Sequence, residues 1–517
     1  MTHALETATW ACLGLALAAG VGGCGPDEGL VTLASGLELR VPGAGPGERL
    51  LEFDLGGPGG AAVPLERALW RDERRAVLRL TRAGAEALFR QGARGRRLAE
   101  GPAPSLWPDP SRLGPRTRCA NPPAVDELLQ ATAPDTWLAW VERVSGARAA
   151  WLDGARQFFP TRYHDVLFGA TDHAAYTFLV RQAEQWGYGP WLEEHAWTDG
   201  WAGRGKNLVL TLPGAAPDAG ELLLTAHYDS TSNQPYSLAP GADDNGSGSA
   251  TLLEAARLLR RWRFQRTIRI IFFTGEEFGL LGSDAYVAGH DVSDVRGVLN
   301  VDMAGWDGDG DGCFEIHAGE LQGSQQLGAC LAAHGDRHGL ALDHDLLTAS
   351  ATWASDHASF WAAGVPAVEI AENFFEPDEP GECDGADFNP YYHTTQDRAG
   401  LAVHLAFAFP VAQAALATLI GEAAPLEPCF EGKPRLQARA SPTGVELTWT
   451  AVPGAARYRI YRAREGCAGQ WEAALETGAT RLRLPAAPPG QAFQVEAVAK
   501  DGLCASTPSP CVPAPAP

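Results

Sequence analysis

The chain has 517 residues, of which 45% are hydrophobic, and its 63 acidic and 41 basic side chains give a formal net charge of −22. This length exceeds one compact domain, so we expect two or three domains with a large buried core. The strong negative charge argues against nucleic acid and against an anionic membrane surface as partners.

The N-terminus has the composition of a targeting segment. Residues 10–21 are apolar, but the run is too short to span a bilayer as a helix. The following Val21-Gly22-Gly23-Cys24 resembles a bacterial lipoprotein cleavage site, with Cys24 as the lipidated residue, although no Lys or Arg precedes Trp10. We therefore expect a signal peptide over residues 1–24 and a protein that is secreted or lipid-anchored outside the cytoplasm; an ordinary signal peptide without lipidation stays open.

Cysteine usage supports an oxidising compartment. If Cys12 is removed with the signal peptide and Cys24 is lipidated, an even set of cysteines remains, and no CxxC pair occurs among them. Such a set in an exported chain favours disulfides over a cysteine-based zinc site. The eight residues are Cys119, Cys313, Cys330, Cys383, Cys429, Cys467, Cys504 and Cys511.

Residues 25–116 form a distinct region. Short apolar runs at residues 50–53 and 76–80 predict strands, and Gly- and Pro-rich stretches separate them. The pattern fits a small β-rich domain or an extended pro-region, and the sequence leaves both open.

Residues 117–422 alternate between helical and strand-like patterns. This alternation predicts an α/β fold, in which helices flank a mixed, mostly parallel central sheet. Expected helices cover 125–144, 173–186, 248–262, 324–339 and 401–420, and expected strands cover 207–212, 221–226, 267–274, 295–301 and 366–371.

Residues 433–512 change to short alternating strands. The run 445–449 alternates cleanly, the Pro453-Gly454 turn follows, and residues 458–461 and 493–498 supply further strands. This spacing predicts an all-β sandwich. The segment resembles a fibronectin type III domain, with Trp449 in the place of the core tryptophan and Tyr458 and Tyr461 in the places of the paired tyrosines.

The residues able to carry chemistry lie in five segments, each at or near the end of a predicted strand. A single acidic pair is usually a solvated turn or a helix cap, and a single histidine is usually a core residue, so each segment is weak evidence alone. Together they form a strong pattern. The segments are 226–230 (AHYDS), 241–245 (GADDN), 275–277 (GEE), 300–303 (NVDM) and 392–397 (YHTTQD).

Charge gives these segments a common interpretation. In an α/β sheet, ligands collect outside the carboxyl ends of the strands, and several carboxylates meeting there would repel one another without cations between them. Histidine and carboxylate ligands without cysteine suit catalytic zinc. Asp229 follows His227 by two residues, so on an extended strand it shares a face with the imidazole and can orient it. Glu276 and Glu277 are adjacent and point in different directions, so one can bind metal while the other faces water.

The five segments resemble those of the zinc aminopeptidases of metallopeptidase clan MH, typified by secreted bacterial leucine aminopeptidases, over about residues 128–419. Further matches are Ser145-Gly146, 161–163 (TRY), 355–357 (SDH) and 364–367 (GVPA). The resemblance implies two zinc ions, peptide substrates and a water nucleophile near neutral pH.

The resemblance also implies a role for each residue. It implies that Asp243 bridges both ions and is followed by a cis peptide bond to Asp244, and that Glu276 is the general base. For the oxyanion it leaves two positions, one occupied here by Thr352 and one by Tyr392, and we favour Tyr392. The remaining ligands are His227 and Asp302 on one ion, and Glu277 and His393 on the other.

An additional acidic run, Asp307-Gly308-Asp309-Gly310-Asp311-Gly312, resembles a calcium loop. The twelfth position, where an EF-hand needs a bidentate Glu, holds Ala318, so the run is not an EF-hand. A non-standard Ca²⁺ site at Asp307, Asp309 and Asp311 and a plain acidic turn between two strands both stay open.

We therefore predict a monomeric zinc aminopeptidase that hydrolyses N-terminal residues from peptides. One alternative is a carboxypeptidase or a glutaminyl cyclase-like enzyme of the same fold, but no Arg can be placed for a substrate carboxylate and the segment 393–397 (HTTQD) fits aminopeptidases better. Another is an inactive binding or adhesion protein, but every expected ligand and the base are present.

Overall fold

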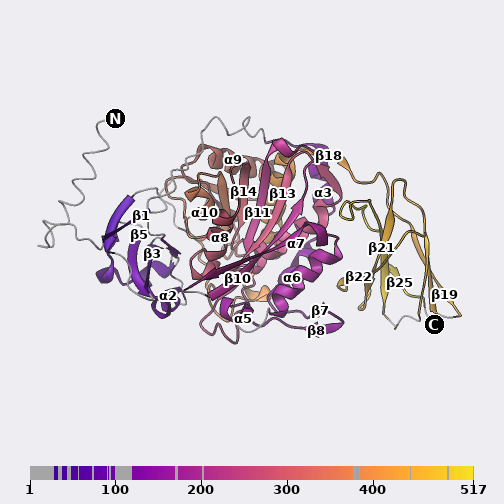
Figure 1. Ribbon diagram of the computed structural model, residues 1–517, viewed down its shortest axis with the longest axis horizontal. Coiled ribbons are helices and arrows are strands. Elements are labelled where there is room, and N and C mark those ends of the chain that lie inside the picture. The colour runs from indigo at the N-terminus through magenta and orange to yellow at the C-terminus, as the bar shows by residue number, and fades with distance from the viewer. Residues whose placement is uncertain are drawn as a thin grey trace, which may run out of the picture.

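The computed structural model describes residues 28–515, except for 33–37, 43–47, 56–57, 73–74, 90, 92, 94, 99–118, 169–172, 201–202, 376–380, 382, 384, 443, 486–487 and 489. In Figure 1 these residues follow one another from an indigo N-terminal unit, through a large central unit, to a yellow C-terminal unit at the opposite end. We call them the N-terminal unit (residues 28–98), the central unit (119–428) and the C-terminal unit (429–515).

The N-terminal unit is a small β structure with one helix. Its main sheet has the order β4-β5-β3-β6, and β1 and β2 form a separate pair. Alternate residues of β3 and β5, among them Leu51, Phe53 and Leu78, are buried in a core shared with the helix α2. The elements are β1 (Glu28–Thr32), β2 (Glu38–Pro42), β3 (Glu48–Asp54), η1 (Pro58–Ala62), η2 (Leu65–Arg67), β4 (Trp70–Arg71), β5 (Arg75–Thr81), α2 (Arg82–Phe89) and β6 (Gly95–Arg97).

An eight-stranded mixed sheet forms the middle of the central unit, in the order β16-β15-β17-β14-β11-β13-β10-β9. Its four central strands, β17, β14, β11 and β13, run parallel, and the edges contain the antiparallel pairs. The strands are β9 (Leu192–Asp199), β10 (Gly203–Leu212), β11 (Glu221–His227), β13 (Thr267–Phe273), β14 (Val295–Val301), β15 (Cys313–His317), β16 (Asp343–Leu347) and β17 (Ala367–Glu372).

Helices cover both faces of this sheet (Figure 1). On β11, Leu222, Leu224 and Ala226 join the core under α4, α6, α7 and α12, whereas the intervening Leu223 joins a second core with α8 and α10. The helices are α3 (Pro123–Gln130), α4 (Pro134–Val144), α5 (His164–Leu167), α6 (Ala174–Gln185), α7 (Gly246–Leu259), α8 (Leu281–Gly289), α9 (Gln322–Arg337), α10 (His357–Ala362), α11 (Ala399–Ala402) and α12 (Leu405–Glu422).

Helix α12 is long and apolar enough to cross a membrane by composition, but 72% of its apolar window is buried inside the molecule. It is apolar on all sides because it packs against α3, α4, α7 and α9 as well as the sheet. We therefore interpret it as a core helix.

Short elements complete the central unit. Among the described residues, β7 and β8 form one antiparallel pair and β12 and β18 another, and three 3₁₀ turns connect strands and helices. They are β7 (Ala150–Leu152), β8 (Ala155–Gln157), β12 (Trp262–Phe264), β18 (Pro425–Pro428), η4 (Gly189–Trp191), η5 (Pro217–Ala219) and η6 (Glu276–Phe278).

The C-terminal unit contains seven strands in two sheets, β19-β20-β23 and β22-β21-β24-β25. Apolar side chains from both sheets, including Trp449 and Tyr458, share one core. The strands are β19 (Leu436–Ser441), β20 (Gly444–Trp449), β21 (Arg457–Ala463), β22 (Trp471–Thr477), β23 (Arg481–Leu484), β24 (Ala492–Val498) and β25 (Val512–Pro513).

A buried charge network joins the C-terminal and central units. Arg260 donates two hydrogen bonds to the Glu496 carboxylate, at 2.8 and 2.6 Å, and Arg459 and the Tyr461 hydroxyl donate to the same carboxylate at 3.0 and 2.8 Å. Tyr461 also belongs to the core of the central unit. Paired in this way, the buried charges are tolerated and link the two units.

The predicted disulfides are confirmed, and all eight cysteines are paired. The bonds are Cys119–Cys330, Cys313–Cys383, Cys429–Cys504 and Cys467–Cys511.

The sheet contains all five strands expected from sequence, but it also contains β9, β15 and β16, which the sequence did not predict. The single helix expected over 125–144 is two helices, because Pro134 begins α4 after a break at residues 131–133. The helices expected near 173–186, 248–262, 324–339 and 401–420 correspond to α6, α7, α9 and α12.

The charge network supports a stability prediction. Glu496→Ala leaves Arg260 and Arg459 without their shared acceptor, and their side chains are only 2% and 5% exposed. We expect the free energy of unfolding to fall by about 3–5 kcal/mol, measured by urea denaturation. Glu446, whose side chain is 24% exposed and pairs with the exposed Arg481 and Arg483, provides the control Glu446→Ala with little change. Similar losses in both variants would contradict the role assigned to Glu496.

Candidate metal centre

Three neighbouring parallel strands bring acidic and imidazole groups to one edge of the sheet. His227 is the last residue of β11, Asp302 directly follows β14, and Glu276 and Glu277 lie in η6, just after β13. Because β13, β11 and β14 are parallel neighbours, their carboxyl ends meet at the same edge. Side chains distant in sequence are therefore collected in one place.

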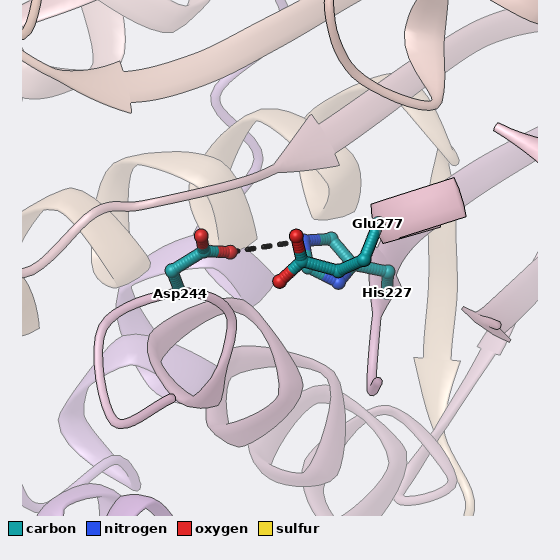
Figure 2. A group of neighbouring side chains, drawn as sticks. All are labelled: His227, Asp244 and Glu277. Atoms are coloured by element: carbon teal, nitrogen blue, oxygen red, sulfur yellow. Dashed lines mark ion pairs between the residues drawn. The ribbon is translucent and has the colours of Figure 1, made fainter. Parts of the chain in front are cut away.

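Loops supply the two remaining groups, Asp244 and His393. Asp244 Oδ1 lies 3.2 Å from His227 Nε2, and its Oδ2 lies 3.1 Å from His393 Nε2. One carboxylate therefore stands between two imidazoles. His227 Nε2 also lies 3.2 Å from Asp302 Oδ1, and His393 Nε2 lies 3.0 Å from Glu277 Oε2. Figure 2 shows His227, Asp244 and Glu277 turned toward one another.

The shared position belongs to Asp244 and not to Asp243, which corrects the assignment made from sequence. Asp243 is fully buried, accepts a hydrogen bond from Asn389 at 2.7 Å, and has its pKa raised to about 7 by burial. The cis peptide bond also lies one residue later than expected, between Asp244 and Asn245. Adjacent residues point in different directions, so only one of the two carboxylates can face both histidines.

The Asp244 loop is held from both sides. The Asp397 carboxylate accepts hydrogen bonds from the backbone N–H groups of Asp243 and Asp244, at 2.9 and 3.1 Å. Asn245 caps α7 by accepting from Gly248 N–H at 2.9 Å, and it donates to the Val301 carbonyl at 2.8 Å. This pairing positions Asp244 independently of any ion.

Neighbouring polar groups orient the strand-end residues. Ser355 donates to Asp302 Oδ2 at 2.6 Å and accepts from the Asn300 amide at 2.8 Å. His227 Nδ1 lies 3.2 Å from the backbone carbonyl of Asp229 and 3.7 Å from its carboxylate. Asp229 therefore lies beside the imidazole, as its spacing predicts, and the closer acceptor for His227 Nδ1–H is its main chain.

The electrostatics show how strongly these groups interact. Burial lowers the pKa of His227, but the Asp302 and Glu276 carboxylates outweigh it and raise that pKa well above its usual value. Burial acts to raise the pKa of Asp244, but the hydrogen bonds from His227 and His393 outweigh it and hold the pKa low. Protons on the imidazoles thus balance the carboxylates in the metal-free protein.

A divalent cation fits this donor set. Both Asp229 carboxylate oxygens and Glu277 Oε1 are buried without a hydrogen-bond partner among the described residues. The nitrogen and oxygen donors, with no cysteine among them, suit zinc. His227, Asp244 and Glu277 offer ligand atoms that all lie within 4.8 Å of one another.

Glu276 lines the same cavity but is not one of the three residues, His227, Asp244 and Glu277, whose ligand atoms lie closest together. Its Oε2 lies 3.9 Å from His227 Nε2, and the side chain is 12% exposed. Burial, together with the Asp302 and Glu277 carboxylates, raises the pKa of Glu276 well above its usual value. A carboxyl group with a raised pKa is suited to exchange protons near neutral pH.

Tyr392 also lines the cavity. Its ring stacks on His393, with centroids 3.8 Å apart, and meets Phe374 edge-on at 5.1 Å. These contacts fix the ring beside the site. Thr352, the other position considered, uses its backbone to bond His317 and His357.

The N-terminal unit reaches this cavity, which the sequence does not predict. His393 Nδ1 lies 2.8 Å from the carbonyl oxygen of Phe89, the last residue of α2. Phe89, Ala93 and Gly95 form part of the cavity wall, and the cavity holds only about 20 Å³. That is space for about one water molecule.

Two further residues matter that the sequence did not single out as functional. Arg162, 1% exposed, donates to the carbonyls of Tyr228, Pro240 and Gly241, and so holds the loop before Asp243. Ser355 orients Asp302. Both stand in segments that resemble the family, but only the fold shows what they contact.

The acidic run 307–312 lies apart, between β14 and β15. Carboxylate oxygens of Asp307, Asp309 and Asp311 lie within 4.8 Å of one another. Each also accepts a backbone N–H of its own loop: Gly312 N–H to Asp307, Asp311 N–H to Asp309, and Cys313 N–H to Asp311. These bonds order the loop as an acidic turn around the three carboxylates.

Comparison with known proteins supports a peptidase. Residues 207–404 match the model of peptidase family M28. A probable leucine aminopeptidase of Trichophyton verrucosum is 32% identical over 201 residues, covering 37% of this chain and 50% of that protein. Aminopeptidase YwaD of Bacillus subtilis is 34% identical over 180 residues, covering 34% and 35%. The chain thus spans half or less of the length of these two relatives.

A solved structure shares the fold. The LapA aminopeptidase of Legionella pneumophila superposes with a TM-score of 0.54 at 21% identity, covering 74% of this chain and 99% of that one. At this identity the superposition shows the fold alone, and the likeness to peptidase family M28 lies in residues 207–404, which contain His227, Asp244, Glu277 and Asp302.

Metal binding should be linked to pH. The raised pKa values of His227, His393 and Glu276 mean that protons occupy the metal-free site, and a metal ion must displace them. We expect zinc added to metal-free protein to raise Tm by about 5 °C or more at pH 8, and by less at pH 6, measured by calorimetry. His393→Ala should lose most of this gain. An equal gain at both pH values would contradict the proton competition.

Proposed function

We propose that the protein is a metal-dependent exopeptidase of the aminopeptidase type, which removes N-terminal residues from peptides. The observation that carries this proposal is the Asp244 carboxylate between His227 and His393, with Glu276 facing the same cavity. Relatives named as aminopeptidases favour this activity over the carboxypeptidase and glutaminyl cyclase alternatives. The complete set of acidic and imidazole groups argues against an inactive binding protein.

Two zinc ions would share the site. His227 and Asp302 would hold one ion, and Glu277 and His393 the other. Asp244 would contribute to both, in the role that the sequence resemblance implies for Asp243. Zinc would polarise the scissile carbonyl, lower the pKa of a water molecule and stabilise the oxyanion.

In this mechanism Glu276 moves the proton. As water attacks the peptide carbonyl, the Glu276 carboxylate accepts its proton and then delivers a proton to the leaving amine. Glu276 faces the cavity without belonging to the closest group of ligand atoms, so its carboxylate can exchange a proton with the attacking water. Tyr392, stacked on His393, would donate a hydrogen bond to the oxyanion.

Several features of the whole protein belong to the same proposal. The four disulfides support a location outside the cytoplasm, reached through a signal peptide over residues 1–24. That segment and the lipidation site Cys24 lie outside the described residues. We further propose that the C-terminal unit is a fibronectin type III-like domain and that the protein is a monomer. We also propose a calcium ion at Asp307, Asp309 and Asp311, which elemental analysis for calcium would detect.

The decisive test is hydrolysis of a panel of aminoacyl-anilides by the wild type and by Glu276→Gln. Loss of the carboxylate should lower kcat about 10²–10⁴-fold, because no group would remain to accept the proton of the attacking water. Zinc content should stay near that of the wild type. The exposed Glu320 provides the control Glu320→Gln, with unchanged kcat. Full activity in Glu276→Gln, or no cleavage of any anilide by the zinc-loaded wild type, would refute the proposal.

We also propose that the N-terminal unit is a pro-region that keeps the site closed. Its Phe89 carbonyl faces the Nδ1 of His393, and its Ala93 and Gly95 narrow a cavity of about 20 Å³, too small for the side chain of a substrate residue. Opening the site would require this unit to move or to be removed by cleavage between it and the central unit.

Specific contacts hold the pro-region in place. Arg82 at the start of α2 bonds the Asp165 carboxylate, and its guanidinium lies 5.5 Å from the centre of the Phe278 ring. Apolar side chains of the N-terminal unit share a core with Tyr163 and Trp197 of the central unit. The docked state is therefore built from packing as well as charge.

Cutting the chain tests this closure. With a site-specific protease sequence inserted within residues 101–114, cleavage and removal of the N-terminal fragment should raise anilide hydrolysis about tenfold or more, and adding the fragment back should reverse the gain. Arg82→Glu should raise activity without a cut, and adding Asp165→Arg to Arg82→Glu should restore closure. Arg67→Glu, a change at an exposed arginine, is the control and should leave activity unchanged.

A second readout separates this closure from the chemistry. Ala354 lines the cavity and is 5% exposed, so the thiol of Ala354→Cys should react faster with a maleimide after the cut. Faster labelling after the cut without any hydrolysis would support closure by the N-terminal unit and contradict the proposed aminopeptidase activity. Equal labelling and equal activity before and after the cut would contradict the closure.

A further inference from the structure

A second cavity lies between the central and C-terminal units, and it shares no lining residue with the metal centre. Its volume is about 170 Å³, compared with about 20 Å³ for the cavity at the metal centre. Its wall is formed by helix α3, by Arg261 and Trp262 after α7, and by two segments that contribute Pro428 and Phe430, and Ser506 and Thr507. The lining residues are Glu127, Leu128, Gln130, Ala131, Arg261, Trp262, Pro428, Phe430, Ser506 and Thr507.

Arg261 is the unusual member of this wall. The residue is only 7% exposed, and its buried Nε has no hydrogen-bond partner in the part of the chain that the structure describes. No carboxylate of the described residues lies within 4.0 Å of its guanidinium, whereas its neighbours Arg257 and Arg260 are paired with Glu254 and Glu496. Among these three arginines, Arg261 alone lacks an anion.

An unpaired buried cation is costly unless something satisfies it. Burial, with the nearby Arg257 and Arg260, lowers the pKa of Arg261 to about 9, so the group still carries its charge at neutral pH. A guanidinium offers five N–H donors in a plane and pairs best with a carboxylate or phosphate. The cavity beside it is large enough to admit such a group.

We propose that this cavity is a binding site for a small carboxylate, whose oxygens pair with the Arg261 guanidinium. Trp262 and Phe430 offer an apolar wall to a short aliphatic or aromatic side chain. Glu127, exposed at the same cavity, suits an ammonium group, so a free α-amino acid satisfies both ends of the site. Since two units of the chain form the wall, an occupied site would also strengthen their junction.

The test uses the metal-free full chain, so that no carboxylate can bind at a zinc ion. The three probes share one aliphatic side chain. Leucine carries both a carboxylate and an ammonium group, 4-methylpentanoate carries the carboxylate alone, and 3-methylbutylamine carries the ammonium alone. At millimolar concentration the two carboxylates should raise Tm by about 2 °C, and the amine should not. A larger shift with leucine than with 4-methylpentanoate would assign the ammonium to Glu127.

Arg261→Met should abolish these shifts, while Arg263→Met, a change at an exposed arginine two residues away on β12, should keep them. Ligand-free Arg261→Met should be as stable as the wild type or more stable, because the unpaired cation is gone; a purely structural arginine would instead destabilise the protein on removal. If Arg261→Met does not fold, hydrogen exchange of residues 258–263 in the wild type should slow with the carboxylates and not with the amine. Equal shifts in wild type and Arg261→Met, or no response to either carboxylate, would overturn the proposal.

Discussion

The structure depends on one electrostatic constraint: several carboxylates meet around two histidines at the carboxyl edge of three parallel strands. Asp244 lies 3.2 Å from His227 and 3.1 Å from His393, and Asp302 and Glu277 each contact one of the same rings. Like charges so close and so buried repel unless cations lie between them. In the metal-free protein protons on the imidazoles supply that charge, and zinc would supply it in the metal-loaded protein.

The surroundings hold this repulsive group in place before any ion binds. Asp397 fixes the Asp244 loop through two backbone N–H groups, Ser355 fixes Asp302, and Arg162 holds the loop before Asp243. The N-terminal unit adds the Phe89 carbonyl beside His393 and so joins the site physically. In the proposed enzyme, metal binding, proton exchange at Glu276 and access of substrate would therefore be linked through shared residues.

Much of this could be predicted from sequence, because strand ends such as His227 and Asp302 follow strongly apolar runs. Polar strands such as β9 and β16 escaped prediction because their side chains do not alternate in hydrophobicity. The choice between Asp243 and Asp244 depends on how one loop turns, which composition does not encode. The Phe89–His393 contact joins residues 304 positions apart through a backbone atom, so no side-chain pattern marks it.

Zinc stoichiometry tests the role of the shared carboxylate, Asp244. Elemental analysis would compare the wild type with Asp244→Asn and Asp243→Asn, two isosteric changes at adjacent buried positions. We expect about two zinc ions per chain in the wild type and in Asp243→Asn, and fewer in Asp244→Asn, because only Asp244 faces both histidines. Full zinc in Asp244→Asn together with loss in Asp243→Asn would contradict this role.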